Sequence, residues 1–300
     1  MNLNDLEDRS YNALMARIAK YEQEAAAVLR DALNTMRARM TVIYEKYARD
    51  GALSLADMTQ YGRLAKLEGD ILGTMNAATR ANVAEFARLR PEQYGEAFFR
   101  YGWAIDQATG VSLKWGLLDK QAIIESLDNR MYKLAVTSYT QDARIRILRA
   151  LNSGLAQGKS YQLMARGLRE AINATAYQAM RIIRTEGQTA QNAAQDAAYE
   201  QAKAQGVELQ DIWDATLDGK TRDSHGAMDG TVRGLDGLFH LQNGEQIPYP
   251  AWQGIRDPAE RINCRCRLRG NIEDYSPALR RTREDGVMPY QTYKEWIKTH

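Results

Sequence analysis

The chain has 300 residues and a mass of 33.9 kDa, and its 40 lysines and arginines against 38 aspartates and glutamates leave a net charge of only +2. A hydrophobic fraction of 44% with 26% charged residues is typical of a globular protein and excludes wholesale disorder. Apolar stretches stay well short of the roughly 18 residues that span a bilayer, and the first residues lack the apolar core of a signal peptide. We therefore expect no membrane association and no secretion, and the two cysteines, two positions apart, indicate a reducing compartment.

Helix breakers divide the chain into a helical part and a part with short elements. Of the six prolines, only Pro91 precedes residue 247, so the chain before that point can be mostly helical. Apolar residues at three-to-four spacing predict a first helix over residues 4–49, which Asp50-Gly51 ends. Ser54 resembles the N-cap of a second helix that ends at Arg90-Pro91, so the two helices are predicted to form a long hairpin.

Further helices are predicted up to residue 204. Pro91 suits the first turn of a third helix, and Asp119 can cap a fourth that reaches about residue 152. Residues 158–160 separate the fourth helix from a short fifth helix, and a sixth is predicted over 177–204. Apolar stripes of this kind are typical of core or partner-helix packing, so we assign these helices to packing and not to a cofactor site.

After Gly206 the sequence pattern changes to short apolar stretches separated by turn residues. Residues 207–217 alternate like a strand, and Asp218-Gly219 and Asp229-Gly230 are turn dipeptides. The predicted fold class is mainly α, with a long helical hairpin and a helical bundle followed by a small α+β C-terminal domain. The predicted domains are 1–110 (hairpin and connecting helix), 111–205 (helical domain), 206–270 (small α+β module) and 271–300 (C-terminal tail).

The stretch 264–269 alternates between cysteine or leucine and arginine, so in a strand Cys264, Cys266 and Leu268 share one face. Two interpretations of this face stay open. The thiols match the ligand preference of zinc together with His225, and with His240 as a candidate fourth ligand. Alternatively, free cysteines behave as small buried hydrophobes, and a second cysteine pair is missing. Use of a cysteine as a nucleophile, with His225 as its base, is weakly supported, and no residue is assigned a catalytic role.

The opposite face of the same stretch carries Arg265, Arg267 and Arg269, with Arg261 just before them. Guanidinium groups bind phosphate and carboxylate equally well, so these arginines are the best candidates for binding DNA or a partner. Three aspartates of the same region are obvious internal partners, and we favour internal pairing over ligand binding. These aspartates are Asp218, Asp223 and Asp229.

Several motifs together resemble the phage Mu protein F-like family of minor head, or head-morphogenesis, proteins. They are WDATLDGKTRDSH at 213–225, MDG at 228–230, YP at 249–250, ERINCRCR at 260–267, RTE at 184–186, GV at 206–207 and the aromatic ending YKEW at 293–296. The resemblance covers about residues 155–300. The residues that match the family motifs are Arg184, Glu186, Trp213, Asp218, Arg222, Asp223, Asp229 and Gly230.

The resemblance implies a structural virion protein of a tailed bacteriophage. Such a protein would lie in the head interior near the portal vertex, bind the portal protein, and act in head assembly, genome packaging or DNA ejection. Major capsid or scaffolding protein and packaged DNA are further candidate partners, and the host cytoplasm is the site of assembly. No cofactor and no enzymatic activity are expected. The alternatives are a zinc- or cysteine-dependent, nuclease-like hydrolase and a nonspecific DNA-binding module. We expect residues 1–205 to carry most of the portal contact.

Overall fold

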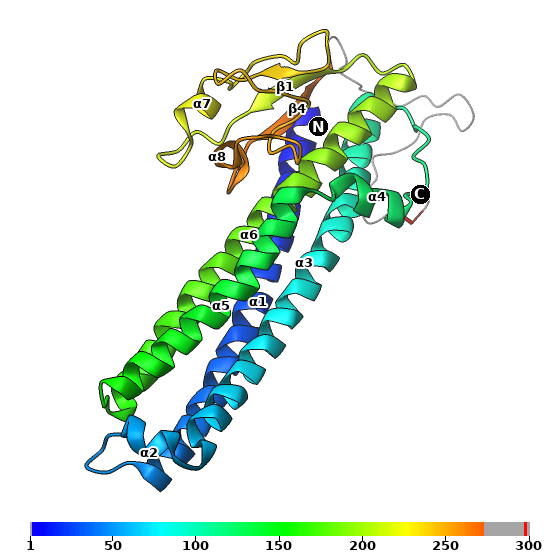
Figure 1. The fold of residues 1–300 in the computed structure, drawn as a ribbon. Coiled ribbons are helices and arrows are strands. Elements are labelled where there is room, and N and C mark those ends of the chain that lie inside the picture. The colour runs from blue at the N-terminus through cyan, green and yellow to red at the C-terminus, as the bar shows by residue number, and fades with distance from the viewer. Residues whose placement is uncertain (1, 273–296, 299–300) are drawn as a thin grey trace. The chain divides into compact units, whose positions relative to one another are not determined.

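The structure is a computed structural model that describes residues 2–272 and 297–298. Its long helices confirm the mainly α class, and two small antiparallel sheets confirm the mixed C-terminal region. None of the helices in these residues is both long and apolar enough to cross a membrane. The larger elements in chain order are α1 (Leu3–Tyr47), α2 (Leu55–Thr59), the 3-10 helix η1 (Gln60–Gly62), α3 (Arg63–Thr109), α4 (Lys120–Leu127), α5 (Arg130–Ala156) and α6 (Tyr161–Ala204) (Figure 1).

The sequence predicts a helix break at Pro91, between the second and third helices, and this prediction is wrong. α3 runs through Pro91, which lies inside the helix and is buried. A proline removes one backbone donor, and the remaining turns and tertiary packing can tolerate that loss. The true interruption comes earlier, at Tyr61 and Gly62, whose φ angles of 54° and 66° are left-handed and end the helical path.

Two more boundaries differ from the prediction. The predicted fourth helix is divided into α4 and α5, because the Leu127 carbonyl accepts hydrogen bonds from the side chains of Arg90 and Asn129 instead of continuing the helical ladder. The predicted fifth and sixth helices are one helix, α6. Its buried residues keep three-to-four spacing across the predicted break before residue 177, and α6 contains no proline.

The chain forms two compact units. The helical unit comprises Lys20–Ala87 and Arg130–Ile183, and its core consists of apolar residues from α1, α2, α3, α5 and α6. One polar group stands out in this unit, because Asn82 donates to the Tyr139 hydroxyl (2.8 Å) and to the Ala25 carbonyl (3.3 Å). The core residues with no more than 1% exposure include Leu29, Met36, Met40, Ile71, Met75, Ala143, Ile147 and Leu151.

The strand-bearing unit comprises Met1–Ala19, Arg88–Asn129 and Arg184–His300. Strand β1 (Gln210–Asp214) pairs antiparallel with β4 (Arg267–Asn271), with Trp213 opposite Leu268. A second hairpin pairs β2 (Phe239–His240) with β3 (Gln246–Ile247), and two short helices, α7 (Asp223–Gly226) and α8 (Pro258–Arg261), lie between the strands in sequence. In Figure 1, β1 and β4 lie beside the beginning of α1.

The predicted tail, 271–300, lies largely outside the described residues, and its aromatic ending at 293–296 lies wholly outside them. The predicted domain boundaries at 110, 205 and 270 stay a prediction.

Candidate functional site

The last part of α6 buries a row of polar side chains. We call these residues the polar seam, and they are Thr185, Glu186, Gln188, Thr189, Gln191, Asn192 and Gln195. Several of them donate to main-chain carbonyls of the segments that lead into β4. Asn192 donates to the carbonyls of Pro250 (2.7 Å) and Cys266 (2.9 Å), and Gln195 donates to that of Leu268 (2.8 Å).

The polar seam compensates for irregular backbone. Thr189 donates to the Ala251 carbonyl at 2.9 Å, and Gln188 makes a second bond to the Cys266 carbonyl at 3.2 Å. Buried carbonyls outside regular ladders need donors, because an unpaired buried polar group costs free energy. The side chains of α6 therefore supply the hydrogen-bond donors that a neighbouring strand would supply from its backbone in a sheet. The sequence analysis did not predict this role.

Glu186 is the charged member of the polar seam. Its carboxylate lies 2.7 Å from Arg261 Nη2 and 3.4 Å from Arg90 Nε, and all three side chains are no more than 7% exposed. Burial raises the pKa of Glu186, although the two guanidinium groups oppose that shift. Arg261, predicted as a ligand-binding residue, therefore belongs to the core of this unit.

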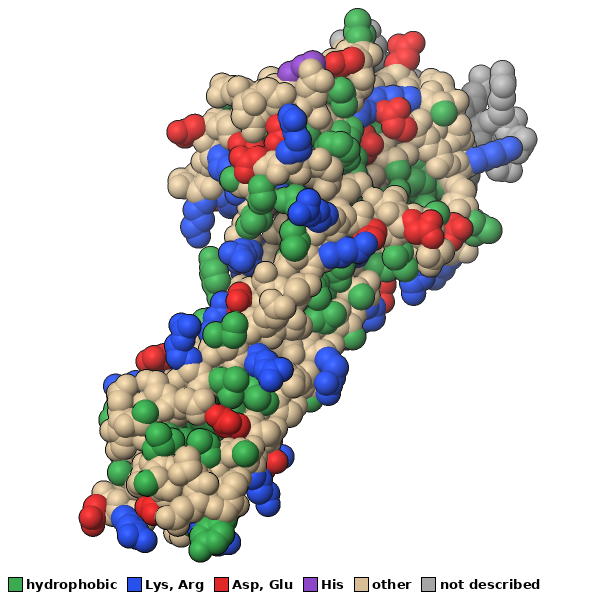
Figure 2. Space-filling view, in the orientation of Figure 1, with side chains coloured by type: hydrophobic (Ala, Val, Ile, Leu, Met, Phe, Trp, Pro, Cys, Tyr) green, Lys and Arg blue, Asp and Glu red, His purple; other side chains and the backbone are tan. Residues whose placement is uncertain are grey.

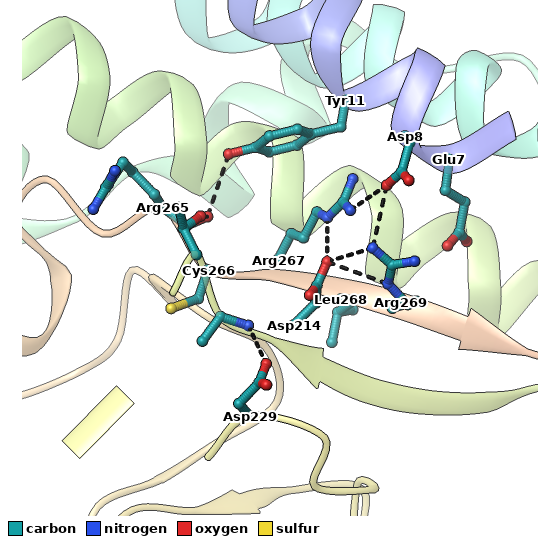
Figure 3. A network of polar contacts seen from close by, with 12 residues as sticks. Glu7, Asp8, Tyr11, Asp214, Asp229, Arg265, Cys266, Arg267, Leu268 and Arg269 are labelled. Atoms are coloured by element: carbon teal, nitrogen blue, oxygen red, sulfur yellow. Dashed lines mark hydrogen bonds and ion pairs between the residues drawn. The ribbon is translucent and has the colours of Figure 1, made fainter. Parts of the chain in front are cut away.

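The other three candidate arginines also have internal partners, and Figure 3 shows those of Arg267 and Arg269. Arg265 forms a two-pronged pair with Asp218 at 2.5 Å for each bond, which lowers the pKa of that carboxyl. Arg267 and Arg269 both contact the Asp214 carboxylate, at 2.6 and 2.9 Å, and both contact the carboxylate of Asp8 on α1.

Two of the three aspartates predicted as partners take other positions. Asp229 accepts a hydrogen bond from the Ala215 backbone N–H at 2.9 Å, and Asp223 begins α7. The partners in their place are Asp214 and Asp8, and the distance of Asp8 along the chain hid it from sequence reasoning.

The other motif residues shape the loops around β1. Trp213 is fully buried, with its ring in edge contact with His225 and Phe239. Arg222 donates to the Ile262 carbonyl at 2.5 Å. Gly230 has a left-handed φ of 75° and donates to the Trp213 carbonyl, while Arg184 is exposed on α6.

A buried carboxyl near the chain start was also missed. Glu7 accepts hydrogen bonds from the Tyr199 hydroxyl and from the Gly270 backbone N–H. Burial raises its pKa to about 7. A β-carbon at Gly270 would lie 2.8 Å from the Leu3 side chain and 3.1 Å from the Glu7 carboxylate, so a larger residue here would have to displace these side chains where β4 approaches α1.

Three of the four candidate zinc ligands are together. His225 Nδ1 lies 3.5 Å from Cys264 Sγ and 3.4 Å from Cys266 Sγ, and all three side chains are buried. His240 is exposed on β2 and contacts Asp236, so it is not part of the cluster. The hydrogen bond between the thiols lowers the pKa of Cys264 and raises that of Cys266.

The sequence has clear relatives. A family model described as phage Mu protein F like protein matches residues 145–269. Minor head protein GP7 of Bacillus phage SPP1 is 27% identical over 289 residues, which cover 94% of this chain and 93% of that relative. The NAD(+)–arginine ADP-ribosyltransferase EFV of Enterococcus faecalis (strain ATCC 700802 / V583) is 26% identical over 279 residues, 90% of this chain but 55% of that relative.

No solved structure matches the chain at a significant level. The motif residues, the match over 145–269 and the similarity along nearly the whole chain agree with one another. Residues 145–269 therefore match the phage Mu protein F-like family, and the chain as a whole is similar to a phage minor head protein.

Proposed function

We propose that this chain is a phage minor head protein that lies in the head interior at the portal vertex, binds the portal protein, and acts in head assembly and in packaging or delivery of the genome. The observation that carries the proposal is the similarity to a minor head protein along nearly the full length of both chains. The portal as the partner rests on the family resemblance of the C-terminal motifs.

Exposed apolar side chains on the helical unit support a role in binding another protein. On α5, Leu134 and Ile145 are 54% and 51% exposed, and their separation of eleven positions places them on one helix face. On α6, Leu163 and Tyr177 are 45% and 62% exposed. Hydrophobic side chains lie between basic and acidic ones along the helices (Figure 2). Apolar side chains that recur along one face of a helix can dock against a hydrophobic groove of a partner.

The arginine pairs favour a structural role over DNA binding by the C-terminal module. Arg261, Arg265, Arg267 and Arg269 already have carboxylate partners within the chain. We also propose that the chain is not an enzyme. The relative named as an ADP-ribosyltransferase is matched over only 55% of its length, so its printed activity does not argue for the same activity in this chain.

Co-purification with the cognate portal protein tests the proposal, and it requires the full chain. A fragment of residues 1–205 would lack β1 and β4 and expose the polar seam. Point variants of the full chain therefore test the contact in place of that fragment. We expect Leu134→Glu with Ile145→Glu to weaken portal binding about tenfold or more, since apolar anchors dominate interfaces. Leu235→Glu, a change at a fully exposed leucine of the strand-bearing unit, is the matched control and should bind normally.

An intact wild-type chain that fails to bind the portal would contradict the proposal. Normal binding by the double variant would instead move the contact to another surface, and Leu163→Glu with Tyr177→Glu would then test the exposed residues of α6.

A further inference from the structure

We infer that His225, Cys264 and Cys266 bind one zinc ion that ties α7 to the segment before β4. This inference is independent of the proposed role at the portal. The ligand atoms are His225 Nδ1 and the two Sγ atoms, and all lie within 4.8 Å of one another. Nitrogen and thiolate sulfur together are the ligands that zinc prefers.

The spacing of these atoms matches a tetrahedral ion. Zinc bonds of about 2.3 Å to sulfur and about 2.0 Å to nitrogen, at the tetrahedral angle, place sulfur and nitrogen about 3.5 Å apart. The observed separations between His225 Nδ1 and the two sulfurs are 3.5 and 3.4 Å. The nitrogen-to-sulfur separations therefore suit one ion that contacts the nitrogen and both sulfurs.

Both sulfurs lie at hydrogen-bond distance from one ring nitrogen. A neutral imidazole Nδ1 has one lone pair and accepts from one thiol, so in the metal-free cluster the other thiol donates to its neighbour's sulfur. A metal ion accepts an electron pair from each of the three atoms instead. When Zn²⁺ binds, each thiol releases one proton, and the two thiolates balance the charge of the ion, so the buried unit is neutral.

A carboxylate positions the histidine. Glu260 on α8 has its Oε2 2.7 Å from His225 Nε2, and the Ser224 hydroxyl donates to the same oxygen at 3.1 Å. This contact places the imidazole proton on Nε2 and leaves the Nδ1 lone pair facing the thiols. A carboxylate behind a histidine ligand is the usual outer contact of zinc sites.

The site joins distant parts of the chain. His225 and Cys264 are 39 positions apart, and the intervening residues include the small β2–β3 hairpin. A metal that closes such a loop reduces the entropy of the unfolded chain and stabilises the module. The described residues contribute three ligands, so a four-coordinate ion has one further position, which a water molecule can take.

Metal analysis of the full-length protein, purified without chelator, tests the inference. We expect about one zinc ion per chain. Addition of Co²⁺ to the metal-free, reduced protein should produce the thiolate-to-cobalt charge-transfer band at a one-to-one ratio. Zn²⁺, but not the oxygen-preferring Mg²⁺, should raise the unfolding midpoint of the stripped protein.

Variants assign the ligands. Cys264→Ser and His225→Gln should lose the metal, whereas His240→Gln, the exposed histidine outside the cluster, should retain it. Zinc below about a tenth of an equivalent, together with no cobalt band in the wild-type protein, would overturn the inference. Both readouts use the wild-type chain, so a variant that fails to fold does not blur the result. Portal co-purification is measured separately, so the two proposals can fail independently.

Discussion

The helical unit and the strand-bearing unit are stabilised in different ways. The core of the helical unit consists of apolar residues that recur at helical spacing. The strand-bearing unit also has an apolar core, but α6 buries the polar seam inside it, and four arginines of its C-terminal module pair with carboxylates. The difference follows from backbone regularity, because helices satisfy their own amides whereas short strands and loops need donors from elsewhere.

The comparison predicts where each unit is sensitive to substitution. The helical unit should tolerate changes that keep volume and hydrophobicity, and the strand-bearing unit should tolerate few changes of polarity. The four tryptophans among the described residues lie in the strand-bearing unit, so tryptophan fluorescence reports on its unfolding, while far-ultraviolet circular dichroism reports on the helices of both units.

The largest effect is expected at the buried ion pair. Glu186→Gln removes the charge that compensates Arg261 and Arg90 in the core, and leaving buried charges unpaired costs about 3–5 kcal/mol of unfolding free energy. Denaturant unfolding followed by tryptophan fluorescence measures the loss.

The control is the pair between Arg39 and Asp70 in the helical unit, where both side chains are more than 40% exposed. Asp70→Asn should cost less than about 1 kcal/mol. Equal losses of unfolding free energy in Glu186→Gln and Asp70→Asn would contradict the expectation that the buried ion pair matters more than the exposed one.

The polar seam gives the next effect. Asn192→Leu keeps the approximate volume but removes the donors to the carbonyls of Pro250 and Cys266, and we expect a loss of about 2–4 kcal/mol. Leu151→Met in the core of the helical unit is the matched change, and it should cost less than about 1.5 kcal/mol. The same unfolding measurements compare the two. A tolerated leucine at 192 would mean that water replaces the amide.

The contrast also explains what the sequence could and could not predict. The apolar periodicity of α1 predicts its bounds to within about two residues, because burial of that stripe is itself what stabilises the helix. Pro91 misled the prediction because its local preference is outweighed by tertiary packing along α3.

The candidate site was predictable where local alternation or ligand chemistry singled out its residues, as for His225 with Cys264 and Cys266. Alternation alone indicated that Cys264, Cys266 and Leu268 share a face, and all three are buried. The pairing of Glu186 with Arg261 spans 75 positions, and no local pattern records such a contact. Nor does any local pattern reveal that the polar residues of α6 face carbonyls and not water.

A smaller effect is expected from pH. Folded Glu7 keeps its proton up to about pH 7, whereas an unfolded glutamate loses it near pH 4.5. The folded state therefore binds more protons between these values, and the free energy of unfolding falls as the pH rises. We expect Glu7 to contribute about 2–3 kcal/mol of the decline between about pH 5 and 8.

Glu7→Gln should remove that part of the pH dependence, while Glu45→Gln, an exposed position further along α1, should leave it unchanged. Asp196, whose pKa burial raises to about 6, adds to the decline in the same direction. Fluorescence-detected unfolding across this pH range measures both variants. A decline that persists unchanged in Glu7→Gln would place the titrating group elsewhere.

The smallest effect is expected for DNA affinity at the C-terminal module. The Asp218 carboxylate already occupies the guanidinium of Arg265, so Arg265→Gln should change the affinity for duplex DNA by less than about twofold. The helical unit, in contrast, exposes Arg144 and Arg149 on α5. Their joint change to glutamine should reduce the slope of log affinity against log salt by about 1–2. Fluorescence anisotropy over a salt series compares the two variants. A large loss of DNA affinity in Arg265→Gln would mean that phosphate displaces Asp218 from Arg265. The arginines in the internal pairs of the strand-bearing unit would then contact DNA as well as stabilise the fold.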